Sequence, residues 1–329
     1  MADNSVAGLQ QRYGYRWRWL AVATVMAGTM STVLSATVVN VALYDIMLEF
    51  GVRQGQIHWL ATGFIAAMTT TMLASSWLLD HFGIRKTLAT AMALFTVISV
   101  LGGFAASPEQ LIAARIGQGA MAGLMQPMAM FLVFRIFPRN QRGQAMGIYG
   151  MGLALFGSTY LIPLFAQTAL GSSATEAGLL MLPAGIVLGI VFPVAGNMAD
   201  KHSSRKLVIF GILAFTLSAT LFALSGFETP LGWLALWAAV GRVGIGFMLP
   251  ALSMGALNPL APEELGAGSS TISFTRQLGG AFGVNMVALA IEHGDHRNGM
   301  PTVEAFQFAW WMVAVFLALA IIPVWKMRT

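Results

Sequence analysis

Long apolar runs, separated by short polar connections, follow one another along almost the whole chain. A membrane-spanning helix requires about 20 mostly apolar residues, and ten runs reach this length within a few residues at each end. They cover residues 20–43, 57–79, 87–106, 111–134, 144–167, 174–198, 207–224, 231–257, 267–291 and 306–325. Prolines inside several runs are compatible with spanning helices, because neighbouring helices satisfy the backbone groups that a proline frees. The pattern predicts an all-α polytopic membrane protein with about ten transmembrane helices.

The composition supports the same fold class. The 329 residues are 57% hydrophobic and 9% charged, with a mean hydropathy of +0.73, whereas soluble domains carry about 25% charged residues. A soluble fold of this size could not cover itself with so few charges. Cysteine is absent from the sequence, which excludes disulfides and thiolate metal sites. The first run, 20–43, is longer than the roughly 7–15-residue core of a cleaved signal peptide, so we interpret it as an anchor.

The distribution of basic residues predicts the orientation in the membrane. Lys and Arg accumulate in the cytoplasmic loops of membrane proteins. With the N-terminal segment 1–19 inside, thirteen of the 18 basic residues fall on the cytoplasmic side, and only Arg53 and Arg297 fall in outer loops. An even number of helices then returns the C-terminus to the cytoplasm. Because the charges occupy short loops between apolar runs, the high pI of about 9.9 indicates a lipid bilayer and no nucleic-acid partner.

One charged connection occurs twice. An acid is followed five residues later by Arg and then Lys, first between the second and third runs and again between the sixth and seventh. The repetition predicts a conformational latch, in which the charges of the loop pair with neighbouring helix ends. The alternative is that these charges only orient the helices. The predicted latch residues are Asp80, Gly83, Arg85, Lys86, Asp200 and Arg205.

A second marker, an Arg followed by two glycines, recurs two runs downstream of each loop. It reads Arg115-Ile-Gly-Gln-Gly in the fourth run and Arg242-Val-Gly-Ile-Gly in the eighth. Repeated halves are a transporter architecture, with the substrate site between them. Since an Arg at a helix centre costs roughly 2.5–3.5 kcal/mol, Arg115 is expected to face protein or water and to find a partner, with Gln118 one turn further on. Alternatively, Arg115 reaches outward to the interface. Arg242 and Arg276 lie nearer the middle of their runs.

Other small and polar motifs have simpler interpretations. The spacing Gly-xxx-Gly predicts close helix contacts at residues 119–123, 185–189 and 279–283. His293, Asp295 and His296 have metal-binding side chains, but no fourth ligand lies nearby, and we interpret them as a solvated loop. No Ser-His-Asp or paired-acid arrangement falls at membrane depth, so neither an enzyme nor a cofactor is predicted.

Four stretches resemble motifs of the major facilitator superfamily, and within it the drug:proton antiporter branch with fourteen helices. They are residues 34–43, 76–86, 111–119 and 276–283, and the resemblance covers about 15–329. It implies a major-facilitator-like two-bundle transporter in the bacterial inner membrane, with bundles 20–153 and 154–329, that exports small amphipathic compounds. The residues placed along the substrate pathway are Ser35, Asn40, Arg115, Gln118, Arg242 and Arg276.

The sequence departs from that branch at three places. Ser35 stands where the motif has Asp, and Tyr44 where it has Pro; no acid lies deep in any run, although a carboxylate is the usual proton carrier in such cavities. The run 144–167 resembles the start of the family's fifth helix joined to the end of its ninth, as if about four helices had been excised near residues 152–156. The Gly- and Pro-rich motif of the fifth helix is therefore interrupted. Two functions stay open: a permease, with doubtful coupling to protons, and a transport-inactive remnant or membrane interaction protein.

Overall fold

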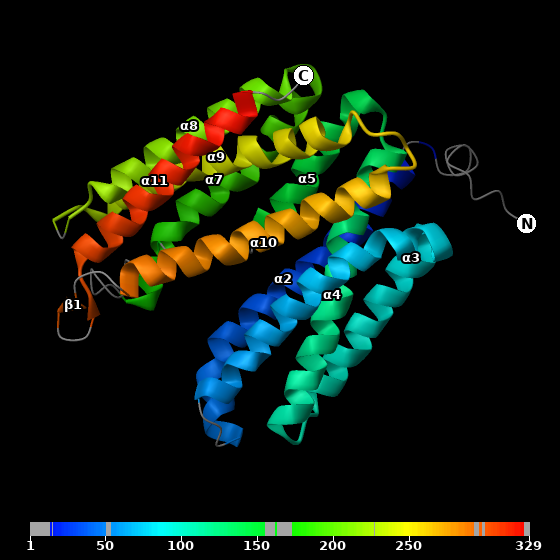
Figure 1. Cartoon of the computed structure of the whole chain (residues 1–329), viewed down its shortest axis with the longest axis horizontal. Helices are drawn as coiled ribbons and strands as arrows, with labels where there is room; N and C mark the ends of the chain where they lie inside the picture. The colour runs from blue at the N-terminus through cyan, green and yellow to red at the C-terminus, as the bar shows by residue number, and fades with distance from the viewer. Residues whose placement is uncertain are drawn as a thin grey trace, which may run out of the picture. The chain divides into compact units, whose positions relative to one another are not determined.

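Helices account for nearly all of the chain that the computed structural model describes, namely residues 14, 16–50, 54–154, 162, 173–226, 228–292, 296–297 and 300–325. The elements (Figure 1) are α2 (Arg16–Phe50), α3 (Gln54–Gly103), α4 (Pro108–Ile136), the 3-10 helix η1 (Arg139–Gln141), α5 (Arg142–Ala154), α7 (Ala174–Lys201), α8 (Ser204–Ala223), α9 (Leu231–Leu257), α10 (Leu265–Glu292), β1 (His296–Arg297), β2 (Met300–Pro301) and α11 (Val303–Trp325).

The helices follow the predicted apolar runs. Among the described residues, six helical stretches are long and apolar enough to cross a membrane, and the longest, Trp59–Gly103, contains most of the predicted runs 57–79 and 87–106. The run 144–167 is covered by α5 as far as Ala154, and the rest of it, apart from Ile162, lies outside the described residues. The outward faces of the helices are apolar, as contact with lipid requires; Ile190, for example, is 62% exposed.

Helix α3 is two helices joined at Gly83. Its 50 residues correspond to about 75 Å of helix, more than twice the hydrocarbon thickness of a bilayer. Gly83 has φ +74° and ψ 156°, a conformation reserved almost entirely for glycine. The buried hydroxyl of Thr87 donates to the carbonyls of Gly83 (2.9 Å) and Leu78 (3.2 Å) and fixes the break. In place of the predicted loop between the second and third runs, the structure therefore has one non-helical residue, Gly83, between two helical segments.

The chain divides into two compact units that interleave in sequence. Unit 1 comprises residues 1–138 and 257–278, and unit 2 comprises residues 139–256 and 279–329. These units do not coincide with the predicted bundles 20–153 and 154–329. Helix α5 joins unit 2 because Gly143 and Gly147 let its backbone approach Gly196 of α7 closely. The first half of α10 joins unit 1, where Ser270 and Ser75 form a 2.7 Å hydrogen bond.

Each unit has its own apolar core. In unit 1 the core lies between α3 and α4 and is rich in methionine; Phe64, Met72 and Met125 are almost completely buried. Helix α4 approaches α3 closely because Gly119 and Gly123 face the backbone of Phe64 and Met68. The predicted close contact is thus confirmed at residues 119–123. At 185–189 and 279–283 a side-chain carbon would meet nothing within 4 Å among the described residues, so the close contact stays a prediction there.

In unit 2 the core lies between α8, α9 and α11, and α8 and α11 run side by side (Figure 1). The rings of Phe222 and Trp310 stack with centroids 4.6 Å apart. Helix α7 begins with a capping box, in which Ser173 and Glu176 hydrogen-bond to each other's backbone N–H. Hydrogen bonds from the Ser173 backbone and hydroxyl hold the pKa of the Glu176 carboxyl below its ordinary value.

Candidate functional site

The guanidinium of Arg115 is the centre of a buried polar cluster in unit 1. Its Nη1 donates to Ser35 Oγ of α2 and to Gln118 Oε1 of α4, each at 2.7 Å. Its Nε donates to the carbonyl of Leu60 at 3.4 Å, and its Cζ lies 4.3 Å from the ring centroid of Phe64. Only 4% of Arg115 is exposed. The expectation that Arg115 faces protein and finds a partner is confirmed, and the alternative of an outward-reaching side chain is not.

Gln118 extends this cluster to the second half of α3. Its Nε2 donates to Ser99 Oγ at 2.9 Å, and Ser99 in turn donates to the carbonyl of Phe95 at 2.6 Å. One cation therefore links α2, both halves of α3 and α4 at a single point. Removing one member of such a buried network leaves the other polar groups unsatisfied, which is more costly than losing a surface hydrogen bond.

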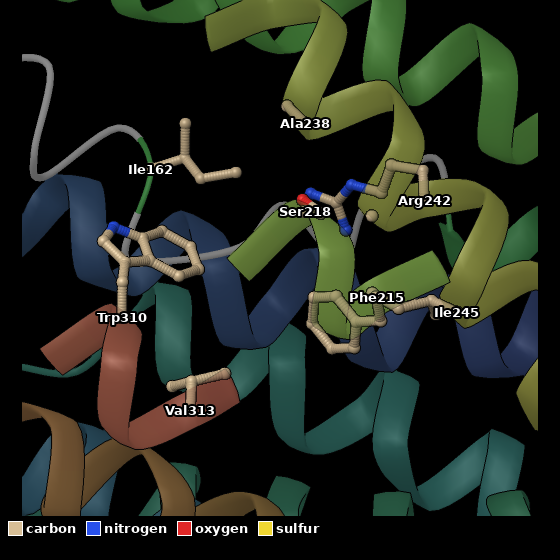
Figure 2. Close-up of a pocket in the computed structure, with 9 residues that line it drawn as sticks. Ile162, Phe215, Ser218, Ala238, Arg242, Ile245, Trp310 and Val313 are labelled. Carbon is tan, nitrogen blue, oxygen red and sulfur yellow. The ribbon is translucent and has the colours of Figure 1, made fainter. Parts of the chain in front are cut away.

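The other predicted pathway residues are placed differently. Arg276 of α10 is partly buried and donates through Nη2 to Gln126 Oε1 at 3.4 Å, also within unit 1. Asn40 lies in α2, but its side chain is outside the described set. Arg242 lies in unit 2 and is 5% exposed. It lines a cavity of about 120 Å³ between α8, α9 and α11 (Figure 2).

The two copies of the predicted latch loop also differ. Asp200, at the end of α7, accepts hydrogen bonds from the backbone N–H groups of Gly143 (2.6 Å) and Gln144 (2.9 Å). These groups belong to the first turn of α5, where helical N–H groups have no partner within the helix. A carboxylate there is also favoured by the helix dipole. Asp200 thus fixes α5 against α7, whereas Arg205 is partly buried at the start of α8.

In the first copy, Asp80, Arg85 and Lys86 are all exposed around the break at Gly83. One turn before Asp80, Ser76 lies beside the first turn of α10: a side-chain carbon built on Gly266 would be 3.8 Å from Ser76 Cβ. The start of α10 therefore lies close to the helix that carries Asp80, just as the start of α5 lies close to the helix that carries Asp200.

Sequence reasoning did not identify several members of these sites. Ser99, Phe64 and Gln126 are ordinary core or helix residues by sequence, and only the packing brings them to an arginine. The role of Gly143 could partly be expected from the sequence, because a small residue at the start of a helix permits close approach of a neighbouring helix. Among the described residues, no group of three metal-ligating side chains occurs; His293 and Asp295 lie outside those residues.

The family model described as Major Facilitator Superfamily matches residues 20–160 and again residues 152–329. Together the two matches cover almost the whole chain. The chain belongs to the Major Facilitator Superfamily. It is thus an integral membrane protein of a family of transporters, which are not enzymes, and the predicted fold class is confirmed.

Relatives within the superfamily are distant. The chain is 21% identical to the uncharacterized MFS-type transporter YhcA of Bacillus subtilis over an alignment of 397 positions. This alignment covers 80% of this chain and 74% of that protein. It is also 21% identical to the multidrug resistance protein B homolog of Mycobacterium tuberculosis, covering 82% of this chain and 75% of the relative. Its fold is similar to that of the proton:xylose symporter XylE, with a TM-score of 0.74 over 95% of this chain and 96% of that chain at 11% identity.

Proposed function

We propose that this protein is a permease of the bacterial inner membrane that exports small amphipathic compounds of neutral or negative charge by alternating access. The observation that carries the proposal is the Arg115 cluster, in which the buried cation is held by Ser35 and Gln118, both neutral. A related protein named as a multidrug resistance protein supports the class of substrate.

The charge balance of the buried residues supports the choice of cargo. Arg115 and Arg242 are buried, and both stay protonated because guanidinium groups do not lose protons near neutrality. No Asp or Glu of the sequence lies deep within a predicted run. A pathway with this balance repels lipophilic cations and accepts anions or neutral molecules. It also has no carboxylate to carry a coupling proton.

We infer that the two charged loops act as latches that each stabilise one conformation. Asp200 is engaged with Gly143 and Gln144 at the start of α5. Asp80 is exposed, near the start of α10. Because the motif is repeated, Asp80 is expected to accept the corresponding backbone N–H groups of α10 in another state of the transport cycle. Both loops are proposed to face the cytoplasm, together with both ends of the chain.

The second function, a transport-inactive remnant or membrane interaction protein, is favoured by the internal shortening. The alignment with YhcA is 397 positions long, but it includes only 80% of this chain, which is about 263 residues. About 134 residues of YhcA within the alignment therefore have no counterpart in this chain. That length is about four helices with their loops. The two family matches overlap at 152–160, close to the predicted junction, which supports an internal shortening at this place. Sequencing the coding DNA across the codons for Gly152–Phe156 would test the junction directly.

Transport of a matched dye pair in proteoliposomes tests the proposed function. Fluorescein and rhodamine 123 share a xanthene core and differ in charge, so their fluxes compare charge at nearly constant shape. We expect the protein to accelerate the flux of fluorescein over that in empty vesicles and to leave rhodamine 123 unaffected. Arg115→Met should abolish the difference. Equal fluxes with and without protein for both dyes would support the inactive remnant, and rhodamine 123 flux alone would contradict the proposed charge selectivity.

A further inference from the structure

A groove on the surface of unit 1 begins at the break in α3. It is lined by both halves of this helix and by α4, through residues that include Leu78, Phe82, Lys86, Leu94 and Met121. Its volume of about 420 Å³ falls within the range of roughly 300–1,000 Å³ that is usual for ligand sites. Because Phe82 is 54% exposed and Leu94 is 43% exposed, the groove is open at the surface of the unit.

The charged and the apolar parts of the groove lie at opposite ends. Lys86 stands three residues after the break, and Leu94 follows eight residues later, which is about 12 Å further along the helix. Helix α4 returns antiparallel beside this half of α3 after a four-residue connection. A side-chain carbon built on Gly117 would lie 3.2 Å from Ile98, so Met121, one turn further along α4, lies near Leu94. The groove thus runs from a cationic end at the break to an apolar end within the membrane span.

Lys86 is the only charged side chain among the described residues that line the groove. It is exposed, and it has no ion-pair partner among those residues that the structure describes. Asp80, the nearest acid in the sequence, is exposed on the other half of α3 and does not line the groove. Because Asp80, Arg85 and Lys86 flank a break between two apolar segments, this end of the groove is expected at a surface of the membrane. The ammonium of Lys86 is therefore available to an anion at the depth of the lipid head groups.

We propose that this groove binds an anionic phospholipid, with the phosphate at Lys86 and one acyl chain along the apolar residues towards Leu94 and Met121. Beyond Lys86 the lining is mostly apolar, which matches an acyl chain. The hydroxyl of Thr87 already donates its proton to backbone carbonyls of α3, so a polar solute would find few partners there. A Lys near the surface of a bilayer attracts anionic lipids.

A lipid in this groove would stabilise the packing of unit 1. The groove is bordered by both halves of α3 and by α4, so a bound acyl chain contacts three helical segments at once. A ligand that binds only the folded arrangement shifts the equilibrium towards it. This binding needs no transported substrate, so the proposed export function and the lipid site can fail separately.

Native mass spectrometry of the full chain, titrated with lipid in detergent micelles, tests the site with dioleoyl phosphatidylglycerol as the probe. Dioleoyl phosphatidylcholine has the same chains without net charge, and glycerol 3-phosphate has the charge without the chains. We expect phosphatidylglycerol to bind about fivefold more tightly than phosphatidylcholine, which is the effect of one Lys near a membrane surface, and glycerol 3-phosphate not to bind. An equal or higher affinity for phosphatidylcholine would overturn the proposal, as would binding of glycerol 3-phosphate as tight as that of phosphatidylglycerol.

Two variants, each with a matched control, assign the binding to the groove. Lys86→Gln should remove the preference for phosphatidylglycerol, whereas Arg135→Gln, which neutralises another exposed cation of unit 1, should retain it. Thr90→Trp places a large ring in the groove between Lys86 and Leu94 and should also remove the preference. Its control is Thr96→Trp, on the same half of α3 but outside the groove; both threonines are exposed, so both variants should fold. Retention of the preference in Lys86→Gln or Thr90→Trp, or an equal loss in either control, would overturn the site.

Discussion

Asp200 of α7 caps the start of the neighbouring helix α5, because its Oδ1 accepts a 2.6 Å hydrogen bond from the backbone N–H of Gly143. The second carboxylate oxygen accepts from Gln144 at 2.9 Å. Two helix-terminal N–H groups of α5 thus obtain partners from α7. The contact requires glycine at position 143, because a side chain there would meet the backbone of Gly196 and the carboxylate itself.

Asp200→Asn should loosen the start of α5 without unfolding unit 2. Asparagine keeps one acceptor oxygen but loses the charge, and an anion at a partly buried helix start contributes up to about 2 kcal/mol. We expect hydrogen exchange at amides 143–146 to become about 5- to 30-fold faster. Asp80→Asn, a matched change at an exposed position of unit 1, is the control and should leave those amides unchanged. Similar exchange in both variants would contradict the contact.

Asp80→Asn should instead affect the rate of transport. If the exposed Asp80 engages the start of α10 in another conformation, its neutralisation destabilises that conformation and slows turnover. The amount of protein in the membrane should change little, because Asp80 is exposed in the state described here. Initial fluorescein flux per molecule of reconstituted protein measures the effect. An unchanged flux would contradict the latch and would mean that the charges around Asp80 only orient the helices in the membrane.

Gly83→Ala should destabilise unit 1 through the backbone alone. At φ +74° and ψ 156° an alanine is strained by about 1–3 kcal/mol, although nothing lies within 4 Å of the added carbon. The matched control is Gly103→Ala, at the end of the same helix, where the added carbon also meets nothing and φ is negative. We expect a lower thermal midpoint for Gly83→Ala only. A similar midpoint for the two variants would mean that the break tolerates a side chain.

Ser35→Asp should introduce a titratable partner for Arg115. Ser35 Oγ lies 2.7 Å from Arg115 Nη1, so a carboxylate at this position would pair with the guanidinium and could exchange a proton for a cation. We expect no uncoupler-sensitive efflux of ethidium from energised vesicles that carry the unmodified chain, and measurable efflux with Ser35→Asp. Ser35→Asn, which has nearly the same shape but does not titrate, is the control. Uncoupler-sensitive ethidium efflux by the unmodified chain would contradict our interpretation of Ser35.

The predicted orientation can be tested by labelling single cysteines, since the chain has no cysteine of its own. A membrane-impermeant maleimide added outside should label cysteines placed at Gly226 or Gly299. It should miss those at Gly83 or Ser203 until the membrane is permeabilised. The reverse pattern would place the termini outside and contradict the distribution of basic residues.

The sequence by itself determined the helices and the fold class. Apolar runs of spanning length are a local property, because in lipid each segment must satisfy its own backbone hydrogen bonds. The break at Gly83 was also visible in the sequence. The burial of Arg115 next to Gln118 followed from the cost of an unpaired charge at membrane depth. All of these depend on residues near one another in the chain.

Only the tertiary structure decided which polar groups meet. Ser99 contacts Gln118, and Gly143 contacts Asp200 across 57 residues of sequence; pairings of this kind depend on how helices pack. The same holds for the two repeated arginines, which share the pattern Arg-x-Gly-x-Gly. Arg115 donates to Ser35 and Gln118, whereas Arg242 lines a cavity together with Phe215 and Trp310. A motif fixes where an arginine stands on its helix, but the neighbouring helices determine what surrounds it.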